Sequence, residues 1–241
     1  MRRIVSIIYP SVFALLTGCS STALRAPEWQ RNFDSSISHY QQRELEADRV
    51  GAQRAFRAAE RAASAGADVG RMALLLLNAC LMDSLSTLNS AERSQACVRF
   101  RSLPKGSVPE EYRGYAALIS GEPLSTTQAV PNQYQKLAYA ISTKAGSYPI
   151  NDTYDPLSHI AAIVMLCRYE LVSIDQLEVA ADRARMQGWR FAHVELDKHR
   201  VLLLRRAGRE NEAKALEERL ALFAARVSGA ATPTVSSAGA R

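Results

Sequence analysis

The chain has 241 residues, of which 47% are hydrophobic and 22% are charged, and its formal net charge is +6 at pH 7. A chain of this length with nearly half of its residues apolar can bury one good core. The positive excess is mild, so it does not indicate a nucleic-acid partner. No region alternates apolar and polar residues over a long stretch, and we therefore expect no β-sheet.

The first 18 residues have the layout of a secretory signal peptide. Arg2 and Arg3 form a short basic start, and an apolar run over residues 4–16 follows. This run is too short to span a bilayer comfortably, because a spanning helix needs about 20 apolar residues. Loss of residues 1–18 would remove two arginines and no acidic residue, which lowers the formal charge from +6 to +4.

The segment ends in Leu16-Thr17-Gly18-Cys19, which resembles the lipobox of bacterial lipoproteins. That resemblance implies a diacylglycerol on the sulfur of Cys19, cleavage before this residue and acylation of the new amino group. Several acyl chains together give stable membrane anchoring. Serine rather than aspartate follows the cysteine, which by the same resemblance implies an outer-membrane destination. The alternative is an ordinary signal peptide or a packed first helix with a chance cysteine.

The rest of the chain divides into three predicted segments. Residues 19–34 are expected to hold the lipidated cysteine and a tether, and residues 35–228 to form one all-helical domain. Residues 229–241 are small and polar in composition, which predicts a disordered tail.

Helical periodicity, with glycine and proline at the ends of the periodic stretches, predicts about nine helices in the domain. The first is a long polar helix over residues 36–65. The second, over residues 71–85, is apolar on nearly every face and is expected at the centre. The others are predicted at residues 90–103, 109–119, 131–143, 156–170, 173–188, 189–207 and 209–227.

These helices predict an all-α fold of stacked antiparallel hairpins, either an α-solenoid or an irregular helical bundle. Residues 203–213 resemble the turn region of a tetratricopeptide repeat, in which Gly208 would permit the tight turn and Ala213 the close approach of the next helix. The last two helical pairs begin near Pro156 and Trp189, close to that family's period of about 34 residues. The earlier pair departs from the pattern, because it lacks the turn glycine.

Three cysteines remain after the anchor residue Cys19, and an oxidising compartment allows one disulfide among them. Cys80 and Cys97 lie symmetrically about a predicted turn at Leu88-Asn89, so they are the preferred pair. The alternative is that all three are buried thiols that behave as small hydrophobic side chains. Cys167 lies in an apolar run and is expected to pack in the core.

The sequence contains no convincing catalytic or metal-binding motif. Ser102 and Lys105 match the S-x-x-K spacing of penicillin-binding enzymes, but Pro104 would break the turn between them. His193 and His199 are six residues apart and point to different helix faces. We therefore predict no catalytic residue, metal, cofactor or small-molecule substrate.

Two groups of aromatic residues favour a binding role. Tyr112, Arg113 and Tyr115 could line a groove, and Tyr134 and Tyr139 belong to a set of tyrosines around a loop. Tyrosine and arginine suit interfaces, because each combines apolar area with a polar tip. The alternative is that about half of these side chains complete the core.

These features together predict a scaffold or adaptor, anchored by lipid in the cell outer membrane and facing the periplasm or the cell surface. It would bind a protein partner, and no nucleic acid, during assembly of an envelope machine such as a secretion system, a pilus or an outer-membrane complex. One alternative is a pilotin-like chaperone for a secretin. The other, which the missing motifs disfavour, is an enzyme that acts on the cell wall.

Overall fold

The structure is a computed structural model that describes residues 26–88, 94–124, 129–145, 148, 150 and 154–229, with side chains as far as Leu222. The predicted lipobox with Cys19 and the predicted tail from residue 230 onward lie outside these residues. The described residues form ten α-helices, two short 3-10 helices and no strand, so the all-α prediction is confirmed.

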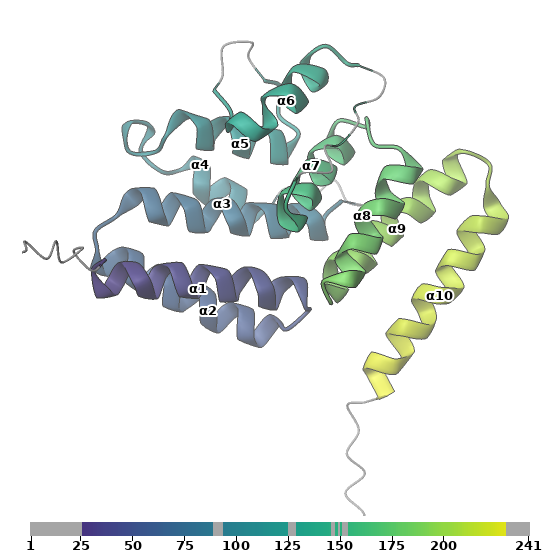
Figure 1. Cartoon of the computed structure of the whole chain (residues 1–241), viewed down its shortest axis with the longest axis horizontal. Helices are drawn as coiled ribbons and strands as arrows, with labels where there is room; N and C mark the ends of the chain where they lie inside the picture. The colour runs from purple at the N-terminus through teal and green to yellow at the C-terminus, as the bar shows by residue number, and fades with distance from the viewer. Residues whose placement is uncertain are drawn as a thin grey trace, which may run out of the picture.

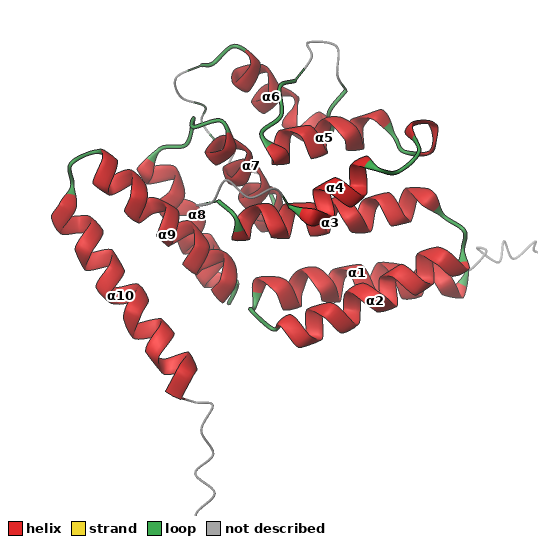
Figure 2. Ribbon diagram, turned by 180° about the vertical axis from the view of Figure 1, so that it is seen from behind, coloured by secondary structure: helices red, strands yellow, loops and turns green. Residues whose placement is uncertain are grey.

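Short turns join α1 to α2 and α2 to α3, and also α7 through α10, whereas longer connections precede and follow α6 (Figures 1 and 2). Their bounds are α1 Glu28–Leu45, α2 Arg49–Ala65, α3 Val69–Ser86, α4 Gln95–Arg101, α5 Glu110–Ser120, α6 Gln135–Ser142, α7 Pro156–Arg168, α8 Ile174–Met186, α9 Arg190–Arg206 and α10 Glu210–Gly229. The 3-10 helices are η1 Lys105–Ser107 and η2 Asn132–Tyr134.

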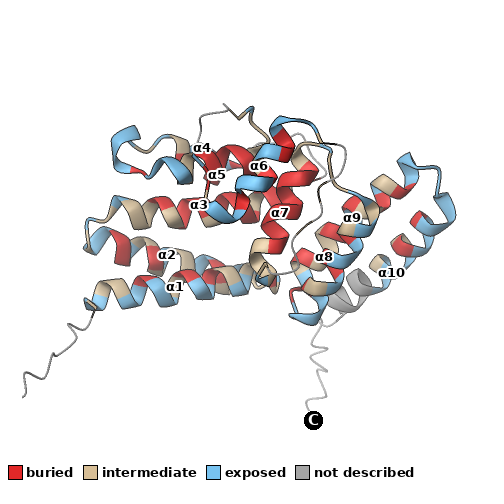
Figure 3. Cartoon of the chain, turned by 45° about the horizontal axis from the view of Figure 1, so that its top comes forward, coloured by how far each residue is buried: buried red, intermediate tan, exposed pale blue. Residues whose placement is uncertain are grey.

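Helix α3 lies at the centre of the fold. It packs on the α1–α2 hairpin on one side and on α4 and α5 on the other, and it also contacts α7 and α9. Ala73, Leu75, Cys80 and Leu85 of this helix are fully buried, as its apolar sequence predicted. Figure 3 shows buried residues concentrated along α3, α5 and α7. Among the described helices, α3 alone is long and apolar enough to cross a membrane, and here it is enclosed by its neighbours.

The prediction of one helix over residues 36–65 is wrong, because α1 and α2 form an antiparallel hairpin. The break lies at Ala47, which has the left-handed backbone angle φ of 68°. Asp48 then caps the new helix, its carboxylate accepting a hydrogen bond from the Gly51 N–H at 2.9 Å. Alanine seldom adopts this conformation, and the glycine that usually marks such a turn in a sequence is missing here.

The helical domain also begins earlier than residue 35. Helix α1 starts at Glu28 and already includes Trp29 and the fully buried Phe33. The Arg71 guanidinium lies over both aromatic rings, 5.6 Å from the centroid of Trp29 and 5.1 Å from that of Phe33. The end of the predicted tether is therefore the first part of the folded domain.

The C-terminal helices α7 to α10 pack as successive neighbours. Helices α7 and α9 begin at Pro156 and Arg190, 34 residues apart. Gly208 has φ of 72° at the turn before α10, as the repeat-like pattern anticipated. At the turn that lacks glycine, Glu170 takes the same left-handed conformation with φ of 57°. The turn geometry is therefore kept without the glycine that usually signals it.

Two sets of contacts hold neighbouring helices onto α3. Cys80 of α3 and Cys97 of α4 form a disulfide with a Cα–Cα distance of 4.6 Å. At the C-terminal end of α3, the Arg168 guanidinium donates to the Ser84 carbonyl at 3.0 Å and to the Thr87 hydroxyl at 2.6 Å. The helix predicted over residues 90–103 corresponds to the shorter α4. The remaining cysteine, Cys167, is buried in α7.

The disulfide gives a direct stability prediction. Because it closes a loop with a sequence separation of 17, replacing both Cys80 and Cys97 by alanine should lower the free energy of unfolding by about 3 kcal/mol. Urea denaturation with and without dithiothreitol measures this. The reductant should destabilise the natural chain and leave the double variant unchanged, and equal midpoints for the oxidised and reduced natural chain would contradict the prediction.

Candidate functional site

Three tyrosines, Tyr115, Tyr134 and Tyr154, pack against one another, and Tyr134 is the buried one. Tyr134 is 2% exposed, and its hydroxyl donates to the Ser158 carbonyl at 3.3 Å. Its ring centroid lies 5.2 Å from that of Tyr115 and 5.9 Å from that of Tyr154. Two predicted binding residues, Tyr115 and Tyr134, are therefore brought together as packing partners.

The other predicted binding residues are separated from one another. The Arg113 guanidinium donates to the carbonyls of Leu103 at 3.3 Å and Pro104 at 2.9 Å, so it fixes the loop after α4. Tyr112 is half-buried and packs against the core. Tyr139 is 73% exposed and lines an open groove of about 420 Å³ on α6. Of the five, Tyr139 alone presents most of its side chain to solvent.

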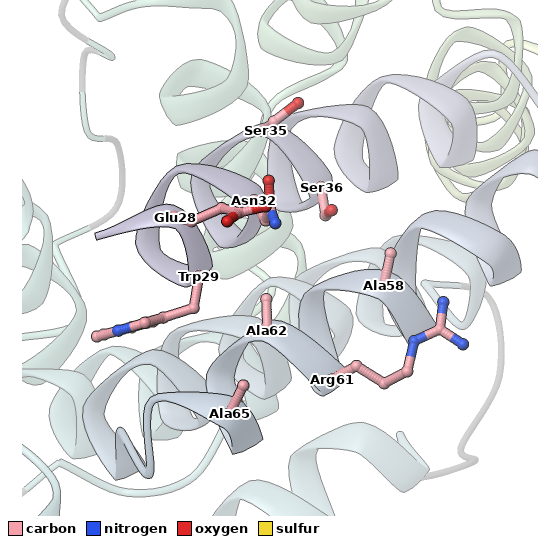
Figure 4. Close-up of a pocket in the computed structure, with 9 residues that line it drawn as sticks. All are labelled: Glu28, Trp29, Asn32, Ser35, Ser36, Ala58, Arg61, Ala62 and Ala65. Atoms are coloured by element: carbon pink, nitrogen blue, oxygen red, sulfur yellow. The ribbon is translucent and has the colours of Figure 1, made fainter. Parts of the chain in front are cut away.

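A second open groove, of about 540 Å³, lies between α1 and α2 (Figure 4). Polar side chains of α1, among them Asn32 and Ser36, face alanines of α2 such as Ala62. Trp29 closes one end by packing so tightly on Gly66 that a Cβ there would lie 2.6 Å from the ring. Small side chains make up much of the lining of this groove, and they give a ligand few distinct features to contact.

A third groove, of about 740 Å³ and larger than the other two, combines aromatic and charged side chains. Five helices and one turn contribute its lining: Tyr40 and Glu44 of α1, Ala47 of the turn, Arg49, Gln53, Phe56, Arg57 and Glu60 of α2, Ala79, Met82, Asp83 and Ser86 of α3, Gln95, Ala96 and Arg99 of α4, and Phe191 of α9. We call it the α2–α3 groove.

The two long walls of the α2–α3 groove are helix faces. The lining residues of α2 run from Arg49 to Glu60 at positions i, i+4, i+7, i+8 and i+11, which places them on one face of the helix. The lining residues of α3, from Ala79 to Ser86, follow the same rule. The fold therefore presents two neighbouring helix faces with a groove between them, and Phe191 contributes from α9.

Two aromatic rings lie in the α2–α3 groove, and an exposed ion pair lies beside them. The rings of Tyr40 and Phe56 meet edge to face with centroids 5.4 Å apart, and Tyr40 is 5% exposed. The Arg99 guanidinium lies 5.9 Å from the Phe56 centroid and forms an ion pair of 3.0 Å with Glu60. The aromatic wall thus already accommodates a guanidinium group.

Two carboxylates, Glu44 and Asp83, interact electrostatically with the Tyr40 hydroxyl. Burial raises the pKa of Glu44, the charge of Asp83 raises it further, and Arg49 partly offsets this. Burial also raises the pKa of the Tyr40 hydroxyl, with added contributions from both carboxylates. The folded chain therefore disfavours the ionised forms of Glu44 and of the Tyr40 hydroxyl in this part of the groove.

Asp83 also has a structural role. Its Oδ2 accepts hydrogen bonds from the Ser94 hydroxyl at 2.9 Å and from the Ala96 N–H at 3.2 Å. These groups begin α4, so Asp83 positions that helix while it lines the groove.

Sequence reasoning missed the α2–α3 groove because it treated residues 36–65 as one helix. Tyr40 and Phe56 would then lie more than four turns apart, whereas the turn at Ala47 folds them against each other. The available signal was Asp48, an N-cap residue type in the middle of a polar helical stretch.

The residues that were weighed for chemistry keep separate places. Ser102 ends α4, and its hydroxyl donates to the Arg99 carbonyl at 2.7 Å. His193 Nε2 lies 3.1 Å from an Asp197 carboxylate oxygen on the same helix. Within the described part of the chain, no group of three or more histidine, cysteine, aspartate or glutamate residues could hold a metal ion.

Comparison with known proteins gives no family to which the chain can be assigned. No family model, curated protein sequence or solved structure matches it.

The raised pKa of Glu44 predicts a pH-dependent penalty. The folded state favours the protonated carboxyl of Glu44. Protonated Glu44 therefore contributes its full stability below the unfolded pKa of about 4.3, and this contribution is lost as the pH rises through the folded pKa. Glu44→Gln should therefore increase the free energy of unfolding at pH 7 and change it little near pH 3.

Urea denaturation at the two pH values measures this effect. The exposed Glu218 of α10 provides the matched control, because Glu218→Gln should give a small, pH-independent change. A Glu44→Gln variant that is less stable than the natural chain at pH 7 would contradict the electrostatic account of the groove.

Proposed function

We propose that this protein is a lipid-anchored scaffold or adaptor of the bacterial cell envelope that holds a helical segment of a protein partner. The α2–α3 groove is the observation that carries the proposal. Aromatic residues together with arginine are enriched at protein interfaces, and an amphipathic helix binds by laying its apolar face into such a groove. The partner would belong to an envelope machine such as a secretion system, a pilus or an outer-membrane complex.

The dimensions of the α2–α3 groove support a helical ligand. Its α2 wall runs from Arg49 to Glu60, a span of about 16 Å at about 1.5 Å per residue. This matches about three turns of a partner helix. The partly exposed Phe56 offers an apolar contact on the α2 wall, and Phe191 adds another from α9.

Two observations support a place at the membrane on the oxidising side. The sequence Leu16-Thr17-Gly18-Cys19 resembles a lipobox, and Glu28 at the start of α1 follows Cys19 by nine residues. Nine residues can span at most about 30 Å, so an anchor at Cys19 would keep the domain near the membrane surface. The Cys80–Cys97 disulfide is typical of proteins outside the cytosol.

The anchor is tested through Cys19. Cys19→Ser should abolish labelling with radioactive palmitate and leave uncleaved precursor, because serine lacks the nucleophilic thiol. Cys167→Ser serves as the control and should label normally. A Cys19→Ser chain that still labels and fractionates with the outer membrane would overturn the lipoprotein assignment.

The groove is tested by site-specific photocrosslinking in cells. A benzoylphenylalanine at Gln53, which is exposed on the α2 wall, should give a discrete adduct, whereas the same group at the exposed Gln187 should not. Ser86→Trp fills the groove from an exposed position and should reduce the Gln53 adduct by about tenfold or more. Ser64→Trp, on an exposed position of α2 that does not line this groove, is the control.

The identity of the adduct separates the proposal from its alternatives. One stoichiometric secretin client would favour a pilotin-like chaperone, which shares the anchor and the groove. An adduct that Ser86→Trp leaves unchanged would show that the partner binds elsewhere. Release of peptidoglycan fragments by the purified chain, with no groove-dependent adduct, would replace the adaptor proposal with a cell-wall enzyme.

A further inference from the structure

The charges of the α2–α3 groove are arranged by depth. Glu44 and Asp83 are half-buried, whereas Arg49 and Arg57 are exposed. The remaining lining charges, Arg99 and Glu60, form an ion pair and cancel one another. The groove therefore has an acidic interior and a basic rim.

The acidic interior has capacity for a cation. Glu44 forms no ion pair within 4.0 Å among the residues that the structure describes, and both hydrogen bonds of Asp83 to α4 use its Oδ2 atom. Two like charges that are partly removed from water repel one another, and a positive group beside them would relieve this repulsion.

The aromatic wall favours the same kind of group. Tyr40 and Phe56 line the groove next to these carboxylates, and aromatic faces attract guanidinium and ammonium groups. The position of Arg99 over Phe56 shows that a guanidinium fits against this wall. Carboxylates and aromatic rings together provide both the charge and the flat surface that an arginine side chain uses.

We infer that the α2–α3 groove recognises a basic side chain, arginine or lysine, of the partner helix, held beside Glu44 and Asp83 at the aromatic pair of Tyr40 and the partly exposed Phe56. This inference rests on the proposed function, because it names the chemistry of the ligand at the same groove. It requires that the partner presents one buried positive charge in an otherwise apolar face.

The basic rim restricts the ligand further. Arg49 and Arg57 are eight residues apart on α2, which corresponds to about 12 Å along the helix. They repel a uniformly basic segment and attract acidic residues that flank the inserted side chain. The groove therefore selects a mixed-charge amphipathic helix and disfavours a polybasic one.

A displayed peptide library tests the inference with the full chain purified in detergent. The library presents helical peptides of about 14 residues, and binders are selected in parallel on the natural chain, on Glu44→Gln/Asp83→Asn and on Ser86→Trp. Asparagine at position 83 keeps an oxygen acceptor for Ser94 and Ala96, so α4 should remain in place. Circular dichroism and urea denaturation check the folding of both variants.

We expect binders that Ser86→Trp excludes and that share one basic position between apolar ones. That preference should disappear in the Glu44→Gln/Asp83→Asn variant. Replacing the basic residue of a selected peptide by neutral citrulline or norleucine should weaken its binding to the natural chain by about tenfold or more, and should change its binding to the double variant little.

Each other outcome has a distinct meaning. Groove-dependent binders without a shared basic residue would overturn this inference and leave the proposed groove intact. A basic preference that persists in the Glu44→Gln/Asp83→Asn variant would overturn it as well. The absence of any binder that Ser86→Trp excludes would overturn the proposed function and this inference together.

Discussion

The burial of α3 is the constraint on which the rest of the structure depends. This helix is apolar around nearly its whole circumference, so it is stable only when other helices cover it from several sides. The α1–α2 hairpin covers one side, α4 and α5 cover another, and α7 and α9 complete the enclosure. The disulfide and the contacts of Arg168 fasten this arrangement at the middle and at the C-terminal end of α3.

The same enclosure creates the candidate site. Helix α4, which has seven residues, lies against α3, which has 18. Helices α2 and α4 both border α3, and residues of all three line the groove. Asp83 joins the two roles, because one carboxylate both positions α4 and lines the α2–α3 groove. Glu44 brings a second partly buried carboxylate, whose pKa is raised by its burial, and such locally unfavourable groups are typical of sites that bind a ligand.

Several elements of the fold could be predicted from local chemistry alone. The apolar pattern of α3 indicated its central place, and Gly208 indicated the tight turn before α10. The break at Ala47 could not be predicted with the same rules, because alanine seldom adopts the left-handed conformation that it takes there. The α2–α3 groove could not be predicted from the sequence for the same reason. Its aromatic pair exists only after that turn, whereas the more conspicuous Tyr134 is used inside the core.

The central claim is that the α2–α3 groove is occupied by a partner in the cell. Hydroxyl-radical footprinting with mass spectrometry tests it by comparing side-chain oxidation in intact cells and in the purified chain. Phe56 and Phe191, both partly exposed in the groove, should be protected several-fold in cells, whereas Met186, which is 74% exposed on α8, should be oxidised equally in both. Equal oxidation of Phe56 and Phe191 in the two samples would contradict an occupied groove.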